Sequence, residues 1–129
     1  MSLLFDSNVF IYQLNGALGH YGQSLLKQGL LTGGAFSVIS KIEVLGYDQS
    51  TDALLKSKRL FNALQQIELN AAIVDRTIAL RQQRKIKIPD AIIAATALQL
   101  ALPLVTHNTR DFQWISDLTL IDPLAEPNP

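Results

Sequence analysis

Five short apolar runs divide the chain, and polar or glycine-containing segments separate them. Runs this short, rich in Leu, Ile, Val and Phe, are typical of buried strands. The pattern predicts strands over residues 2–6, 35–39, 67–69, 104–106 and 118–122.

Between these runs, apolar residues recur every three or four positions, which is the period of an amphipathic helix. Start and stop signals support this interpretation: Ser7 or Asn8 and Asn70 are helix caps, Pro89 suits a first helical turn, and Gly33 suits a helix end. The predicted helices cover residues 7–14, 20–31, 40–47, 51–64, 70–84 and 88–101.

Strands and helices alternate along the whole chain, which indicates an α/β fold with a mostly parallel sheet. The length of 129 residues suggests one domain over residues 1–129, with a frayed tail at about 124–129. In open parallel sheets, ligands bind at the carboxyl ends of the strands. The residues that follow each strand are therefore the first candidates for function.

Composition narrows the class of protein. Eleven basic and eleven acidic residues give a net charge of zero, which argues against a protein that coats nucleic acid through bulk charge. The absence of Cys excludes disulfides and thiolate metal sites. The longest apolar stretch, 91–105, is too short for a membrane span, and no secretory leader is visible. We expect a soluble, cytoplasmic protein.

Three carboxylates, Asp6, Glu43 and Asp111, follow expected strands, and a fourth, Asp90, lies in the first turn of a predicted helix. Each has an ordinary structural explanation. Asp6 can cap the next helix, and Glu43 can close a Ser40-x-x-Glu43 capping box. Asp90 lies in a first helical turn, where the helix dipole favours an anion, and Asp111 lies in a polar loop. None of these explanations accounts for four acids at one end of one sheet.

Carboxylates that converge in a crevice repel one another and are costly to desolvate. A divalent cation removes that cost, and an oxygen-only set of ligands favours Mg²⁺ or Mn²⁺ over Zn²⁺. The sequence therefore predicts a Mg²⁺ or Mn²⁺ site.

Three segments resemble the PIN domain, and specifically VapC-like ribonuclease toxins: "LLFDSNVFIY", "SVISKIEVLGY" and "IPDAIIAATALQLALPLVTHNTRDF". The resemblance extends from Leu3 to about Pro123. It implies a three-layer α/β/α sandwich with a central parallel sheet. It also implies a Mg²⁺- or Mn²⁺-dependent endoribonuclease that leaves a 3′-hydroxyl and a 5′-phosphate, forms a homodimer and is neutralised by a VapB-like antitoxin.

The resemblance also assigns roles to residues. Asp6, Glu43 and Asp90 match three acidic ligands of the family, and the fourth position remains open between Asn108 and Asp111. These acids would hold the metal and make up the catalytic site.

Other polar residues would contact the RNA substrate. Asn8 and Thr106 match polar positions that line the site of the family, although a helix cap and a strand-end hydroxyl explain them equally well. Because RNA is a polyanion, basic side chains near the acids should hold its phosphates. Arg110 is the preferred candidate. The other candidates are Lys41, Arg81, Arg84, Lys85 and Lys87.

Other functions remain to be weighed. An aspartyl phosphatase would need an acid where the chain has Asn8, and a metal-free ribonuclease would rest on His20 and His107 alone. The more serious alternative is a PIN-like module that binds RNA or a protein without cleaving, which Asn108 keeps open. Six leucines in the N-terminal half either belong to the core or form an apolar groove for the dimer and the antitoxin: Leu25, Leu26, Leu30, Leu31, Leu54 and Leu55.

Overall fold

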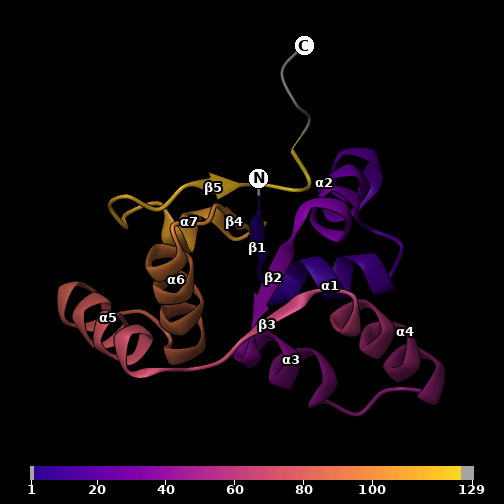
Figure 1. The fold of residues 1–129 in the computed structure, drawn as a ribbon, viewed down its shortest axis with the longest axis horizontal. Helices are drawn as coiled ribbons and strands as arrows, with labels where there is room; N and C mark the ends of the chain where they lie inside the picture. Colours follow the sequence, from indigo (N-terminus) through magenta and orange to yellow (C-terminus); the bar gives the residue numbers. More distant parts are fainter. Residues whose placement is uncertain (1, 126–129) are drawn as a thin grey trace.

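The computed structural model describes residues 2–125 and contains a five-stranded sheet in which every pair of neighbouring strands is parallel (Figure 1). The strand order is β3-β2-β1-β4-β5. This arrangement confirms the predicted α/β fold. The strands are β1 (Leu3–Phe5), β2 (Gly34–Ser37), β3 (Gln65–Ile67), β4 (Leu104–Val105) and β5 (Leu120–Ile121).

Helices cover both faces of the sheet, as the three-layer prediction requires (Figure 1). One layer contains α1 (Ser7–Leu14), α2 (Gly19–Thr32), α3 (Val38–Leu45) and α4 (Thr51–Asn62). The other contains α5 (Ala71–Gln83), α6 (Ile88–Leu100) and the short α7 (Thr109–Phe112).

The apolar strands contribute side chains to two separate cores, one on each face of the sheet, because successive side chains of a strand point to opposite faces. Leu3 and Phe5 pack with α1, α2, α3 and α4, whereas Leu4 packs with α5, α6 and α7. A strand that is buried on both faces has no polar positions to alternate with, which explains its continuous apolar run.

The strand order reverses at β1, which is the topological switch point of the sheet. The first β-strand pairs with β2 on one side and with β4, from the far end of the chain, on the other. Because Phe5 pairs with Val105 in parallel register, Asp6 and Thr106 follow at the same edge of the sheet. Sheets of this kind bind ligands at such a point.

Several predicted boundaries are wrong by a few residues. The strand predicted over 35–39 ends at Ser37, whose hydroxyl accepts a hydrogen bond from the Ile39 amide and starts α3 early. The strand predicted over 67–69 lies at Gln65–Ile67, and only Leu120–Ile121 of the run 118–122 is a strand. The run 109–112, predicted as loop, is helical.

Most of the predicted helix start and stop signals are confirmed. Asn70 caps α5 by accepting from the Ile73 amide, Pro89 lies in the first turn of α6, and Gly33 ends α2 with φ of 103°. Ser7 and Asn8 are not caps, because Asp6 takes that position in α1. Residues 126–129 of the predicted tail lie outside the described residues.

Among residues 2–125, no helix combines the length and the apolar character that crossing a bilayer would require.

Candidate functional site

Asp6 lies between β1 and α1 and is held on both carboxylate oxygens. Oδ1 accepts from the Ser7 amide at 2.7 Å, which is the cap of α1. Oδ2 accepts from Thr106 Oγ1 at 2.7 Å and from Asn8 Nδ2 at 3.3 Å. The residue is only 4% exposed. The carboxylate is thus a helix cap, as the ordinary explanation held, and also part of a polar cluster at the strand ends.

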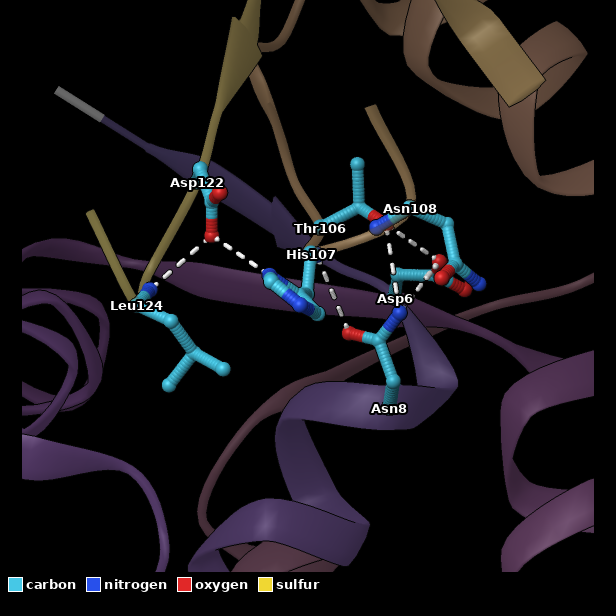
Figure 2. Close-up of polar contacts among 7 residues, drawn as sticks. All are labelled: Asp6, Asn8, Thr106, His107, Asn108, Asp122 and Leu124. Atoms are coloured by element: carbon cyan, nitrogen blue, oxygen red, sulfur yellow. Dashed lines mark hydrogen bonds and ion pairs between the residues drawn. The ribbon is translucent and has the colours of Figure 1, made fainter. Parts of the chain in front are cut away.

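Thr106 is the centre of this cluster, and Figure 2 shows the contacts around it. Its Oγ1 also accepts from Asn8 Nδ2 at 3.3 Å and from the Asn108 amide at 3.1 Å. The side-chain Oδ1 of Asn8 in turn accepts from the His107 amide at 3.4 Å. These bonds join α1 to the segment after β4 and fix the orientation of Asp6.

Glu43 projects from α3, and its predicted capping box with Ser40 is wrong. Because Ser37 caps α3, Ser40 lies inside the helix and is fully buried. Glu43 Oε1 accepts instead from Ser7 Oγ at 2.7 Å, and the Ser7 and Ser40 hydroxyls are 3.0 Å apart. The exposed Glu43 carboxylate is therefore tethered to α1, beside Asp6.

Asp90 lies in the first turn of α6, where the helix dipole favours its negative charge. Its pKa is nevertheless raised above the ordinary value, first by partial burial and then by the charges of Asp111 and Glu43, against an opposing effect of Lys87. Asp90 therefore lies within electrostatic reach of two other predicted ligands.

The pKa of Asp6 is raised further, from 3.8 to about 6. Burial is the main cause, and the charges of Asp90 and Glu43 add to it. Hydrogen bonds from Thr106 and the Ser7 amide lower the pKa but do not compensate. The free carboxylate at this position is thus costly to ionise.

Asp111 and Arg110 are exposed on α7, and Asn108 precedes the helix without a side-chain bond to its amides. A pocket of about 500 Å³ is lined by Asp90, Asp111 and Arg110 together. A second pocket of about 390 Å³ adjoins it and is lined by Asn108, Arg110 and Asp111. Both residues proposed for the fourth position are therefore at the surface of this edge.

The four acids are neighbours, but they do not form a closed cage. In residues 2–125, no three His, Cys, Asp or Glu side chains are arranged so that they could hold a metal ion. Mg²⁺ usually keeps several water ligands and takes only one or two carboxylates directly. Asp6 and Asp90 are the two carboxylates whose pKa values are raised by burial and by neighbouring acids, so a bound cation would stabilise their ionised forms most.

Sequence reasoning missed two features of the site. The hydroxyl of Ser7 reaches Glu43 from another helix, and no local pattern indicates this contact. His107 Nδ1 lies 3.1 Å from Asp122 Oδ1, and the two form an ion pair when the imidazole is protonated (Figure 2). The only available signal was that His107 follows one predicted strand and Asp122 ends another.

The fold and the site place this chain among the α/β proteins that have a parallel sheet of order 3-2-1-4-5 and acidic residues at the switch point of that sheet. A family model described as "PIN domain" matches residues 3–117. The chain belongs to the PIN domain family.

Solved structures support this membership. A chain of the toxin-antitoxin complex from Klebsiella pneumoniae is 32% identical, with a TM-score of 0.74; the match covers 94% of this chain and 97% of that chain. A chain of VapBC2 from Rickettsia felis, bound to a promoter DNA fragment, is 21% identical, with a TM-score of 0.80 and coverage of 94% and 98%.

A chain of DNA-bound VapBC from Salmonella typhimurium is 18% identical, with a TM-score of 0.81 and coverage of 95% and 98%. At their level of identity, the Rickettsia and Salmonella chains show the fold alone. No curated protein matches this chain.

Proposed function

We propose that this chain is a Mg²⁺- or Mn²⁺-dependent endoribonuclease, and that it is the toxin of a VapBC-type toxin-antitoxin pair. Its membership of the PIN domain family and the 32% identity to a chain of a toxin-antitoxin complex support the proposal. The acidic cluster at the switch point of the sheet supports the chemistry.

The observation that most strongly supports a metal site is the environment of Asp6. This carboxylate is 4% exposed, and its pKa is raised to about 6 by burial and by other acids. No Lys, Arg or His of residues 2–125 forms an ion pair with it. A buried carboxylate among like charges is stabilised when a cation joins it, and the oxygen-only donor set suits Mg²⁺ or Mn²⁺.

Asp6 and Asp90 would bind the ion, with Glu43 and Asp111 completing the shell directly or through water. A bound ion would supply polarisation of the phosphoryl oxygen and a lower pKa for a water ligand. Thr106 and Asn8 hold Asp6 in place through their hydrogen bonds. No Ser or Cys nucleophile is needed.

Arg110 lines the same pocket as Asp90 and Asp111 and would hold a phosphate of the substrate. The acidic residues alone would repel a polyanion, so a cation at the rim is required for substrate binding.

The antitoxin and the homodimer are the second half of the proposal. Leu25 and Leu26 are buried, so the predicted apolar groove is smaller than the sequence suggested. Leu30, Leu31 and Leu55 are exposed by 43%, 74% and 49%, respectively. An apolar surface on α2 and α4 of this kind suits a protein partner.

The test is cleavage of a labelled single-stranded RNA by the purified chain. Cleavage is expected with Mg²⁺ or Mn²⁺, and EDTA should stop it. Asp90→Asn should lower the rate at least about 100-fold. Asp75→Asn, which removes an exposed acid from α5, is the matched control and should leave the rate unchanged. Binding without cleavage under all conditions would instead support the non-cleaving module.

A further inference from the structure

A groove of about 500 Å³ lies between the end of α5, the start of α6 and α7, and Asp90 and Asp111 form part of its lining. We call it the basic groove. Its remaining lining includes five of the eleven basic residues of the chain. These are Arg81, Arg84, Lys85, Lys87 and Arg110.

The charge of the basic groove is only partly neutralised within the protein. Although the whole chain has a net charge of zero, five cations and two carboxylates line this groove. The ion pairs within residues 2–125 are Lys56–Asp52 and His107–Asp122, so none of the five cations of the groove belongs to one. The groove therefore keeps a net positive charge that suits an anionic ligand.

The basic groove also contains Trp114, the single Trp of the chain. Its Nε1 donates to the Asp111 carbonyl at 2.9 Å, and part of the side chain packs against the core under α5 and α6. The guanidinium of Arg84 lies over the ring, 5.1 Å from its centroid. The indole is thus held in a fixed orientation, with an exposed cation over one face.

Cations that follow a groove, together with a fixed aromatic ring, are the features by which proteins bind single-stranded nucleic acid. An acidic protein segment would match the cations alone, whereas the fixed ring of Trp114 beside them favours a ligand with stacking bases, and a duplex keeps its bases inside the helical stack. An exposed cation–π contact is also weaker than the stacking of a base on an aromatic ring. A base can therefore replace the Arg84 guanidinium.

We propose that single-stranded RNA enters along the basic groove, with one base stacked on Trp114 and with Arg84 released from the ring to a phosphate. The Trp114 hydrogen bond to Asp111 would place the stacked nucleotide beside the acids, with its neighbouring phosphate held by Arg110 in the pocket that Asp90 also lines. This inference rests on the proposed ribonuclease function and names the residues that bind the substrate.

The single Trp gives a direct readout. Single-stranded RNA, added to the wild-type chain in EDTA, should quench the fluorescence of Trp114, because a base stacked on indole quenches it. Duplex RNA of the same sequence should quench little. The integrity of the RNA is checked on a gel. Absence of quenching by single-stranded RNA, or equal quenching by the duplex, would overturn the proposal.

Variants distinguish the contribution of stacking to RNA affinity from the contribution of charge. The affinity is measured by the fluorescence anisotropy of a labelled RNA. Trp114→Ala should weaken binding by about 5- to 150-fold without changing its salt dependence. Arg84→Ala should reduce the slope of log affinity against log salt by about 0.7. Trp114→Phe keeps an aromatic ring and should bind within about fivefold of wild type. Lys58→Ala, which removes an exposed cation from α4, is the control and should bind as wild type does.

The outcomes also distinguish this inference from the proposed function. If the wild type cleaves RNA with Mg²⁺ and Trp114→Ala binds and cleaves equally well, the stacking site is refuted and the ribonuclease stands. If binding depends on Trp114 but no metal supports cleavage, the stacking site stands and the ribonuclease is refuted.

Discussion

The Thr106 hydroxyl donates a hydrogen bond to Asp6 Oδ2 at 2.7 Å, and this bond joins two residues that lie 100 positions apart in the chain. The contact exists because β1 and β4 are neighbours in the sheet and end at the same edge. It is one of the two hydrogen bonds that oppose the rise in the pKa of Asp6.

Thr106→Val should therefore raise the pKa of Asp6 above about 6. Valine keeps the shape of the side chain but cannot donate, so the ionised carboxylate loses a stabilising bond. The measurement is a ¹³C carboxyl titration of the metal-free protein. Thr106→Ser should restore the wild-type midpoint, and an unchanged midpoint in Thr106→Val would contradict the assignment.

Asp6→Asn should stabilise the metal-free protein at neutral pH. The pKa of Asp6 is about 6 in the folded state against an ordinary 3.8, so ionisation opposes folding. The cost is absent below about pH 4, grows between pH 4 and 6, and is complete above pH 6. Urea unfolding in EDTA should show a gain of up to about 3 kcal/mol at pH 7.5.

At about pH 3 the same variant and the wild type should have equal free energies of unfolding, since Asp6 is then mostly protonated in both the folded and the unfolded state. Asp75→Asn is again the control and should show no such pH-dependent difference. A wild type that is more stable than Asp6→Asn at pH 7.5 would show that burial does not penalise this charge.

Ser7→Ala should impair catalysis without unfolding the protein. The Ser7 hydroxyl holds Glu43 at 2.7 Å, and residues that orient a metal ligand typically contribute about 10- to 100-fold to activity or metal affinity. Mn²⁺ affinity and kcat should fall together while Tm changes little. Ser24→Ala, which removes an exposed hydroxyl from α2, should change neither affinity nor kcat.

Asp111 and Asn108 can be compared as the fourth ligand. Asp111 carries a charge that raises the pKa of Asp90 and lines the same pocket, whereas Asn108 offers only a neutral amide. Asp111→Asn should weaken Mn²⁺ binding at least about tenfold, and Asn108→Ala less than about threefold, by calorimetry. The reverse order would assign the fourth position to Asn108.

Leu31→Glu should disrupt the proposed homodimer. The side chain is 74% exposed on α2, and a charge buried in an apolar interface is costly. Light scattering should show a dimer for the wild type and a monomer for the variant. A wild type that remains monomeric at high concentration would remove the basis for an interface here.

Hydrophobic periodicity predicted the class of fold because β1 and β2 are buried on both faces and most helices are buried on one face, and the sequence shows both patterns. The periodicity did not predict boundaries that are set by a local hydrogen bond. The run 35–39 is apolar throughout, yet the Ser37 hydroxyl caps α3 and ends the strand. Apolarity does not distinguish a strand residue from the first buried turn of a helix.

The candidate acids were also predicted from the sequence, since Asp6, Glu43 and Asp111 follow expected strands and Asp90 lies in the first turn of a predicted helix. Their partners were not. The sequence offered Ser40 as the partner of Glu43, and the fold supplied Ser7, 36 positions away. A capping box is only one of the contacts open to a Ser-x-x-Glu motif, and the start of the helix decides among them.

By itself, the sequence determined the alternation of strands and helices and the types of residue at their ends, because these depend on local spacing and burial. Only the tertiary structure decided which ends meet. The strand order brings β4 next to β1 and places Thr106 on Asp6, while burial and the charges of Asp90 on α6 and Glu43 on α3 raise the pKa of Asp6. The electrostatic cost that favours a cation arises from this long-range packing, which no local pattern contains.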